Sequence, residues 1–471
     1  MNLKSSSNRQ LPNALWSNYL VILCGLWLLS SPFSFGPFSF GDEEIWMRVS
    51  DLGTGALLIF FSTLSLFAHL SWPRWINGGL GVWLTFAPLA FWTSSAAAYA
   101  NGNLIGSLVI ISSVILPSLW PSLLRKEDEL SETPSQWTYN PSSWNQRIPI
   151  IGLAVIGFLL AKYLAAFQLG HIPSVWDPFF GKGTETILRS DVSRAFPVSD
   201  AGLGAWSYLL DALSGAWGSQ RRWRTMPWVV ILFGLMVIPP GVTSIVLVIL
   251  QPVAVGAWCT ICLVTAAVML LMVPPAIDEV VATGQFLIQS RREGKPFWPT
   301  FWRGDLAMQA LREQRPMELG SHRRQSEFGR LGKTASLLWT LRNWTLLISA
   351  ALGIWLMAAP TVFGMTGLAA DSNHLLGALI VTVAVIAMAQ VARPIRFLNC
   401  VFGVILAIGI WFIPDGTLIF QWNSALTGIM LFILSIPLGQ IVDRFGNYDR
   451  IIRWSPLLRR RSVDRNQDKA A

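Results

Sequence analysis

Two of the four cysteines lie three residues apart, in the run Trp258-Cys259-Thr260-Ile261-Cys262. A close pair of this kind serves either in metal binding or in dithiol–disulfide chemistry. A structural zinc site needs about four ligands, often supplied by two such pairs, and the sequence has neither a second pair nor a nearby histidine. Redox chemistry is therefore the favoured interpretation. Two small cysteines packed inside a membrane helix remain the alternative.

The cysteine pair stands at the start of a long apolar segment that reaches about Pro274. A helix that begins here places the pair at its N-terminus, where the helix dipole favours a thiolate. The thiolate is the nucleophile of thiol chemistry, and the second thiol of such a pair resolves a mixed disulfide. The local sequence thus predicts an activated dithiol at a helix start.

Composition indicates what kind of element must hold this pair. The chain has 471 residues, of which 53% are hydrophobic and 13% charged, and it contains 24 tryptophans. Such a chain is a multi-pass membrane protein, with indole rings suited to the membrane–water interface. In this setting the net charge of +9 reports topology, and we expect no nucleic-acid partner. Residues 1–13 form a short polar leader with no cleavable signal pattern.

Apolar windows long enough to cross a bilayer recur along the chain. We predict about twelve spans, of which residues 200–217 are the weakest because this segment is short and has polar flanks. The predicted spans are 15–34, 52–70, 75–95, 103–121, 149–169, 200–217, 227–249, 259–275, 344–362, 374–392, 397–413 and 424–441.

Lysine and arginine are unevenly distributed between the two sides that alternating spans define. With the N-terminus inside, most of the 35 Lys and Arg residues fall in inside segments; the loop residues left outside are Arg48, Lys182, Arg189 and Arg194. This asymmetry follows the positive-inside rule and requires the weak sixth span to cross. The cysteine pair then lies at the outer side, where disulfides persist. We predict a bacterial cytoplasmic (inner) membrane protein with both termini in the cytoplasm.

Part of the chain is repeated. The pattern is Trp, then eight residues, then Gly-x-Trp-Leu-x-x-x-Pro, with full copies beginning at Trp16, Trp72 and Trp344. A fourth, degenerate copy contains Gly409 and Trp411. A fixed period of this size indicates one structural unit used several times, here a helical hairpin. Glycine permits close helix approach, tryptophan anchors at the interface, and proline ends the helix.

These repeats resemble the SPW repeat family of membrane proteins, with Ser31-Pro32-Phe33 standing where that family has Ser-Pro-Trp. The resemblance implies membrane helices and little about activity. It divides the chain into an SPW-type block of four spans (1–122), a cytoplasmic linker (123–147), an inserted module (148–276), a second cytoplasmic linker (277–335), a second four-span block (336–442) and a basic cytoplasmic tail (443–471).

The inserted module carries a second resemblance. Its outer loop contains Ser190 and leads into Phe-Pro-x-Ser-x-x-x-x-Gly-x-x-x-Tyr, from Phe196 to Tyr208, and two spans later comes the Cys259/Cys262 pair. This order is similar to the core of the vitamin K epoxide reductase family. The resemblance implies an all-α arrangement in which a four-helix redox bundle is inserted between two four-helix repeat blocks.

The second resemblance also implies a site. Cys262 would face a lipid quinone (ubiquinone or menaquinone), and Cys259 would exchange with another thiol pair. Ser190 matches the loop serine that precedes the second helix, so these three residues form the predicted catalytic set. A lipid quinone can serve as a two-electron sink.

The candidate quinone-contacting residues are Trp258, Ala266 and Lys162. Trp258 precedes the cysteines, and Ala266 stands one turn after them where the family has a tyrosine. Lys162 lies within a span near its outer end. Snorkelling towards the membrane surface is the favoured role for it, and contact with a quinone oxygen is the alternative.

The outer loop departs from the family pattern. Usual members carry a second cysteine pair in this loop, whereas Thr184 stands at the inner relay position here. We expect Cys24 and Cys400 to serve in packing. The chain has no fused thioredoxin-like domain, so a thioredoxin-like partner would be a separate extracytoplasmic protein.

Two functional classes follow from these observations. The first is a membrane thiol/quinone oxidoreductase, in which electrons pass between the cysteine pair and a lipid quinone. The second is a non-enzymatic scaffold or transporter with a degenerate reductase-like domain, because paired repeats are common in transporters. Membrane lipids are partners in either case, and no metal site is expected.

Overall fold

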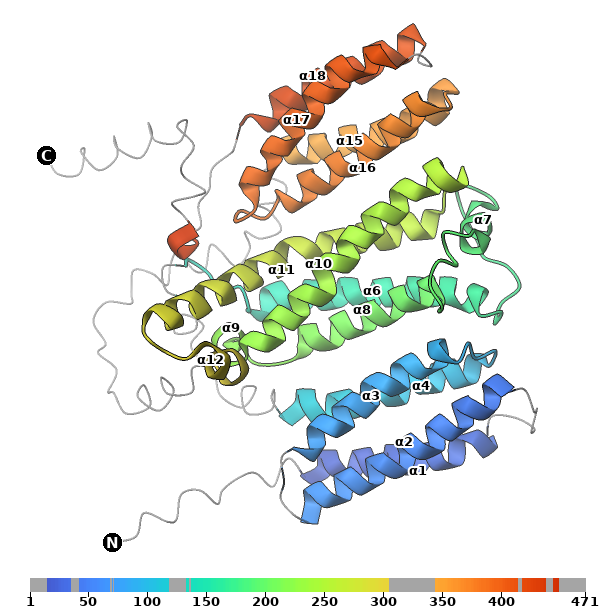
Figure 1. Cartoon of the computed structure of the whole chain (residues 1–471), viewed down its shortest axis with the longest axis vertical. Helices are drawn as coiled ribbons and strands as arrows, with labels where there is room; N and C mark the ends of the chain where they lie inside the picture. Colours follow the sequence, from blue (N-terminus) through green and yellow to red (C-terminus); the bar gives the residue numbers. More distant parts are fainter. Residues whose placement is uncertain are drawn as a thin grey trace, which may run out of the picture. The chain divides into compact units, whose positions relative to one another are not determined.

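The described chain is built from helices (Figure 1). This computed structural model describes residues 15–34, 42–67, 70, 72–117, 133–134, 137–304, 344–413, 417–437 and 444–448. The predicted leader 1–13, part of the first linker, residues 305–335 of the second linker and most of the tail 443–471 lie outside these ranges.

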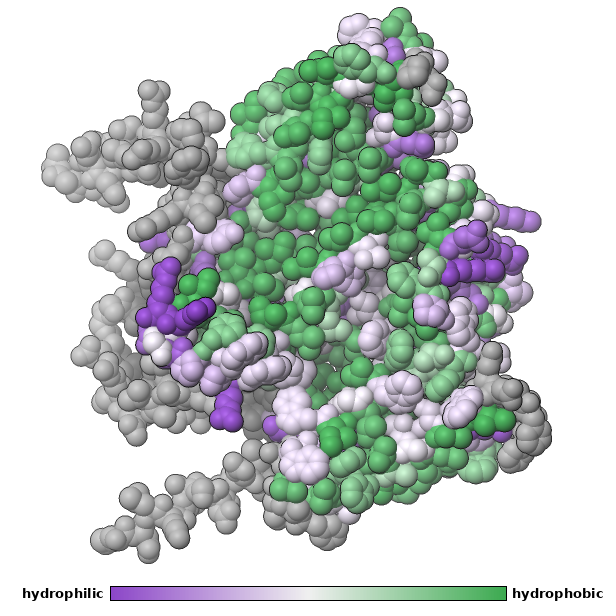
Figure 2. Space-filling model, viewed as in Figure 1, coloured by the Kyte–Doolittle hydropathy of each residue, from purple (hydrophilic) through white to green (hydrophobic). Residues whose placement is uncertain are grey.

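Ten helical segments of the described residues are long and apolar enough to cross a membrane, which confirms an all-α polytopic membrane fold. Two other predicted spans are helices that are not long and apolar enough to be counted among these ten: α3 (Pro73–Ala90) and α8 (Asp200–Ala216). The second of these is the predicted weak span, and it has only 17 residues. In Figure 2 apolar residues cover the lengths of the helices, while hydrophilic residues gather near α7 (Gly183–Arg189) and α12 (Phe297–Arg303).

The described chain forms two compact units, and the division between them falls inside the inserted module. The first unit comprises Met1–Glu127 and Val155–Ser219, and the second comprises Asp128–Ala154 and Gln220–Ala471. Helix α6 (Trp144–Gln168) passes from the second unit into the first. The four-helix bundle expected for residues 148–276 stays a prediction, because α8 belongs to the first unit, the two helices after residue 226 belong to the second, and α6 is divided between them.

The first unit contains one repeat block and α8. The block consists of α1 (Leu15–Ser34), α2 (Asp42–Phe67), α3, and α4 (Ala96–Ile110) extended by the π-helical turn η2 (Ile111–Ile115). Helix α8 packs on α3. There the Trp206 indole N–H donates to Thr85 Oγ1 at 3.1 Å, and its ring lies 5.1 Å from that of Phe86.

The second unit contains α9 (Arg222–Thr225), α10 (Pro227–Leu250) with the π-helical turn η4 (Gln251–Val255), and α11 (Thr260–Arg292). Its repeat block consists of α15 (Trp344–Phe363), α16 (Leu368–Ile386), the segment η5–α17–η6–η7 (Arg393–Phe412) and α18 (Leu418–Ser435). Both α10 and α11 pack on α16.

Each repeat block closes in the same way. Its first and second helical segments pair, its third and fourth pair, and the first also contacts the fourth. Glycines face each other where the hairpin helices cross, and a Cβ added to the first glycine of any pair would lie within 3 Å of the partner's carbonyl oxygen. The crossing pairs are Gly25/Gly55, Gly81/Gly106, Gly353/Gly377 and Gly403/Gly428.

The crossing glycines correct the register of the fourth repeat. The sequence pattern assigns Gly409 to the crossing, but a Cβ there would meet only Ile405, at 3.7 Å. A Cβ on Gly403 would lie 2.6 Å from the main-chain oxygen of Gly428. The spacing misled because the crossing glycines Gly353 and Gly403 are 50 residues apart, whereas Gly25 and Gly81 of the first block are 56 apart.

The repeated tryptophans also make cross-helix hydrogen bonds. The Trp27 indole N–H donates to Asn101 Oδ1 at 2.8 Å, and that of Trp355 donates to Asn423 Oδ1 at 3.0 Å. Both bonds join the first helix of a block to its fourth. The repeat prolines Pro32, Pro88 and Pro360 lie in the last turns of their helices.

Helix α11 continues well beyond residue 275, where its membrane span was expected to end. It reaches Arg292 because its charged residues are partnered inside the unit. Asp278 Oδ2 accepts from the Tyr139 hydroxyl at 2.8 Å, and Glu279 binds Arg222. Part of the predicted linker 277–335 is therefore a packed helix.

Candidate functional site

The central feature of the site is the cysteine pair at the start of α11. Cys259 and Cys262 form a disulfide with their Cα atoms 5.3 Å apart. Cys259 is the N-cap residue, and its sulfur accepts from the Cys262 main-chain N–H at 3.0 Å. The sulfur therefore occupies the position at a helix N-terminus where negative charge is stabilised.

A short loop holds the pair in place. Gly256 has a φ of +70°, a left-handed conformation that glycine adopts without steric cost. It turns the chain between the end of η4 and the cysteines. The Gln251 side-chain oxygen accepts from the Cys259 main-chain N–H at 2.9 Å, and its main-chain oxygen accepts from Ala257 at 3.2 Å.

Gln251 is a site residue that we did not predict. It is 4% exposed and satisfies the one main-chain donor of Cys259, which would otherwise be buried without a partner. The available signal was a lone polar residue at the end of an apolar span, eight positions before the first cysteine.

The two cysteines differ in exposure. Cys259 is fully buried, whereas Cys262 is half-buried. Trp258 and Ala266, which flank them, are half-buried as well. The structure therefore gathers four predicted site residues at one helix start, with Cys262 as the more accessible sulfur-bearing residue.

Ser190 lies in the first unit, where it caps α7. Its hydroxyl donates to the Ile187 carbonyl at 2.7 Å and accepts from the Ser193 main-chain N–H at 3.4 Å. These contacts give Ser190 a local role in shaping the outer loop. Its predicted catalytic role stays a prediction.

The outer loop is held by hydrogen bonds at the position where a relay cysteine was expected. Thr184 is fully buried, and its hydroxyl donates to Asp177 Oδ2 at 2.5 Å. The other carboxylate oxygen of Asp177 accepts from the main-chain N–H groups of Phe179 and Phe180. The Thr184–Asp177 bond thus folds this part of the loop into a compact turn.

Gln168 links the same loop to α8. Its side-chain nitrogen donates to Asp200 Oδ1 at 2.6 Å and to Ser193 Oγ at 2.5 Å. Its oxygen accepts from Ser199 Oγ at 2.5 Å, and Ser199 is the N-cap of α8. This network positions the loop against the helix start, and its partners are too dispersed in sequence to be recognised beforehand.

Lys162 also belongs to the first unit. Its ammonium group lies 5.5 Å from the Tyr99 ring centroid and 5.7 Å from that of Phe158. Aromatic faces attract a cation at such distances. The aromatic contacts describe how Lys162 is accommodated, and its contact with a quinone stays a prediction.

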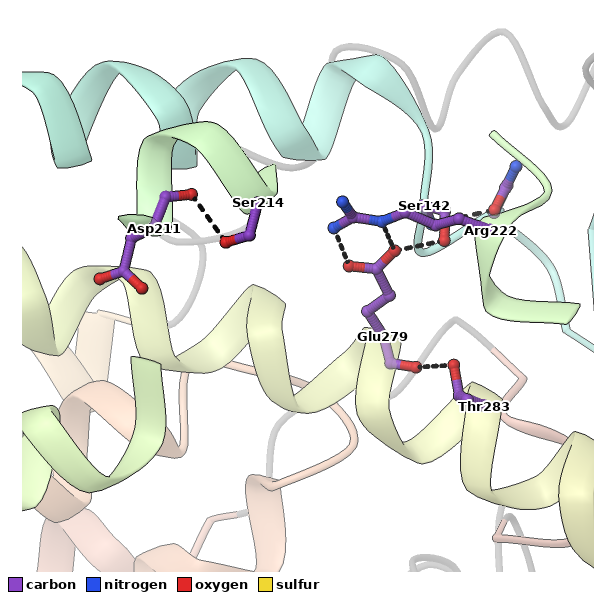
Figure 3. Close-up of polar contacts among 7 residues, drawn as sticks. Ser142, Asp211, Ser214, Arg222, Glu279 and Thr283 are labelled. Atoms are coloured by element: carbon purple, nitrogen blue, oxygen red, sulfur yellow. Dashed lines mark hydrogen bonds and ion pairs between the residues drawn. The ribbon is translucent and has the colours of Figure 1, made fainter. Parts of the chain in front are cut away.

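A buried ion pair lies far from the cysteines along α11. Arg222 donates through Nε and Nη2 to the two carboxylate oxygens of Glu279, each at 2.6 Å (Figure 3). Ser142 also donates to this carboxylate. Glu279 follows Cys262 by 17 residues, roughly 25 Å at the rise of an α-helix. This bidentate pair fixes α9 and the segment before α6 on α11, and it lies too far away to act on the disulfide.

Asp211 in α8 is fully buried, and its carboxylate oxygens have no hydrogen-bond partner among the described residues. Ser214 Oγ donates to the Asp211 main-chain oxygen at 3.3 Å (Figure 3). Within the described part of the chain, no group of three or more His, Cys, Asp or Glu residues could hold a metal ion.

Comparisons with known proteins agree with both resemblances. A model of the Vitamin K epoxide reductase family matches residues 148–277, and a model of the SPW repeat domain matches residues 15–116 and 343–437. No curated protein and no solved structure gives a significant match. The chain therefore carries a reductase-family domain between two SPW repeat regions, and the disulfide belongs to that domain.

Proposed function

We propose that this protein is a membrane thiol oxidoreductase in which the Cys259–Cys262 pair transfers electrons between an outside dithiol and a lipid quinone. The observation that carries the proposal is the disulfide at the N-terminus of α11, within the stretch matched by the reductase-family model. That match supports a membrane thiol oxidoreductase. The quinone and the direction of electron flow belong to the proposal.

The chemistry balances with two electrons and two protons. In the oxidising direction, an outside dithiol reduces the Cys259–Cys262 disulfide to two thiols and becomes a disulfide itself. A bound quinone would then accept two electrons and two protons, which restores the Cys259–Cys262 bond. The Cys259 sulfur lies at the helix N-terminus. There the helix dipole stabilises the negative charge of a Cys259 thiolate in the reduced pair.

The surroundings of Cys262 suit a flat apolar ring. Cys262 is half-buried, and the residue one turn later, Ala266, is half-buried and has a small side chain. Helix α10, which pairs with α11, contains no charged residue. These features support Cys262 as the residue that meets the quinone.

Exchange with an outside dithiol requires the loop before α11 to move. Cys259 is fully buried and is held by Gln251, so an outside thiolate cannot reach its sulfur in this conformation. Gly256 gives the loop a flexible point. We therefore assign thiol exchange to Cys259 in a loop-open state, with a separate thioredoxin-like protein as the proposed partner.

The charge asymmetry supports a topology for this reaction. With both termini in the cytoplasm, the cysteine pair lies at the outer face of a bacterial inner membrane, which is the oxidising side. Alkylation with a membrane-impermeant maleimide, applied to intact cells and to inside-out vesicles, tests this orientation. Labelling of the reduced pair only from the cytoplasmic side would contradict it.

The reaction itself is tested by mapping thiols in the membrane-embedded protein. Peptide mass spectrometry after alkylation is expected to find Cys259 and Cys262 protected under oxidising conditions and both labelled after mild reduction. The free cysteines Cys24 and Cys400 serve as internal references. If both thiols of the pair were always labelled, the redox function would be wrong and the scaffold alternative would be preferred.

A further inference from the structure

The second repeat block supplies a histidine to the cysteine loop. Helix α16 packs on η4, α10 and α11, and its residue His374 is 6% exposed. The His374 ring lies 5.3 Å from the Trp258 ring, centroid to centroid, in a T-shaped arrangement. Because Trp258 precedes Cys259 directly, this contact connects α16 to the start of the redox pair.

One ring nitrogen of His374 is free to take a proton. The main chain of Met357, on α15, forms a hydrogen bond with the imidazole, whereas Nδ1 is buried and has no hydrogen-bond partner among the residues that the structure describes. A main-chain carbonyl accepts a hydrogen bond, so the partnered nitrogen carries the hydrogen in neutral imidazole. The lone pair is then on Nδ1.

Few charged groups surround this imidazole within its unit. The sequences of α10, η4 and α15 contain no Asp, Glu, Lys or Arg, and α11 has none before Asp278. Asp371, one turn earlier on α16, is the charged group that acts on His374. The thiols that these elements carry are Cys259 and Cys262 on the α11 side and Cys400 in α17.

Arg393 and Arg396 belong to η5, which follows the opposite end of α16. His374 is therefore a basic side chain that the second unit places beside the cysteine loop. An imidazole side chain can take up and release a proton, and a charge acts strongly in such weakly polar surroundings.

We propose that His374 is a positioning residue for the redox pair, which takes up a proton when the disulfide is reduced and so favours a thiolate. The proposal rests on the proposed oxidoreductase function. Reduction of the disulfide by a dithiol delivers two electrons and two protons, and one of these protons moves to Nδ1, leaving a thiolate and an imidazolium. Re-oxidation by a quinone removes the two electrons together with both protons.

The T-shaped contact joins the imidazole to the residue that directly precedes Cys259. The SPW-type block thereby contributes to the chemistry of the inserted domain in addition to crossing the membrane. This role could not be read from the sequence, since His374 and Trp258 are separated by 116 positions and by the long second linker.

The pH dependence of thiol alkylation tests the proposal. The full chain in lipid nanodiscs is reduced with dithiothreitol, and N-ethylmaleimide labelling rates are measured from about pH 5.5 to about pH 9, resolved by peptide. We expect His374→Gln to slow labelling of the more reactive thiol of the pair about tenfold at neutral pH, equivalent to a shift of about one pH unit. His374→Phe, which keeps a ring against Trp258, should give the same shift.

His171→Gln is the matched control, because His171 is bound to the Thr93 carbonyl in the first unit. His171→Gln should leave the pH profile of labelling at Cys259 and Cys262 unchanged. The His374 variants should leave the labelling profiles of Cys24 and Cys400 unchanged. Profiles of both His374 variants that coincide with the wild type would overturn the proposal. If neither variant folds, a wild-type pair that shows no ionisation below about pH 8 would overturn it as well.

The same samples separate this proposal from the function on which it rests. A pair that never forms a disulfide contradicts the oxidoreductase function. Normal disulfide formation with an unchanged pH profile contradicts only the role of His374.

Discussion

At the scale of residues, the disulfide lies among side chains that come from other elements. Gln251 binds the main chain of Cys259, and His374 contacts Trp258. The cysteine pair could be identified from its spacing and its place at a helix start. Gln251 and His374 could not be identified in this way. One forms a hydrogen bond from the end of the preceding span and the other makes a ring contact from another block, and neither contact leaves a pattern in the local sequence.

Gln251→Ala should make the disulfide easier to reduce. The substitution leaves the buried Cys259 N–H without a partner, which costs about 1–3 kcal/mol and favours the loop-open state. We expect reduction by a dithiol to become several-fold faster, as measured by quenched alkylation over time. Gln289→Ala is the control, since that exposed side chain binds Glu293 at the other end of α11. An unchanged reduction rate in Gln251→Ala would show that Gln251 does not restrain the loop.

Thr184→Val should loosen the outer loop. Valine keeps the shape of threonine but leaves the Asp177 carboxylate without its hydroxyl donor, at a cost of about 1.5–3 kcal/mol for a hydrogen bond to a charged group. Limited proteolysis from the outer side should cut the loop faster in this variant. Thr184→Ser, which keeps the hydroxyl, should behave as the wild type, and equal cleavage of all three proteins would contradict the role of this bond.

At the scale of elements, the hairpin crossings and the length of α11 show where a pattern predicts well and where it fails. The repeat spacing correctly placed three of the four crossing glycines. It failed at the fourth because the interval between the two crossings is six residues shorter in the second block than in the first, 50 instead of 56. The end of α11 was placed too early because a charged stretch looks like a solvated linker when its buried partners, such as Tyr139 and Arg222, are distant in sequence.

Gly403→Ala and Gly409→Ala should have different effects, although both glycines lie in one helical segment. A Cβ at Gly403 would be 2.6 Å from the Gly428 carbonyl oxygen, so the helices must separate, at a cost of about 1–3 kcal/mol. At Gly409 the Cβ has space, and alanine should be neutral or stabilising by up to about 1 kcal/mol. Thermal unfolding in detergent measures both variants. Equal loss of stability in the two variants would contradict the assignment of the crossing to Gly403.

Glu279→Gln should destabilise the inner end of α11. Arg222 is fully buried and would lose its charged partner, for which about 3–5 kcal/mol is expected. The double substitution Arg222→Met with Glu279→Leu removes both charges and should recover much of the stability. Denaturation of the full chain in detergent compares the three proteins. A double variant as unstable as Glu279→Gln would indicate that the ion pair has a role beyond mutual neutralisation.

At the scale of the whole molecule, the order of domains in the sequence and the grouping of helices in space differ. Charge, apolar windows and repeats predicted a helical membrane protein with two repeat blocks, and the resemblance to the vitamin K epoxide reductase family implied a reductase-type insert between them. The fold and the family matches agree. The division of the insert between two compact units was not predicted, because side chains that join α8 to α3 and α10 to α16 follow no repeat. The blocks therefore form packing partners for the redox domain.

In the proposed reaction, a lipid quinone oxidises the Cys259–Cys262 pair. The direct measurement uses the full chain in quinone-free nanodiscs, reduced by a dithiol that is then removed, with the redox state followed by mass-shift alkylation after quinone is added. We predict that the disulfide re-forms as an equal amount of quinol appears, and that the Cys259→Ala/Cys262→Ala protein produces no quinol. A pair that stays reduced after quinone addition, or equal quinol formation by the double variant, would contradict the account.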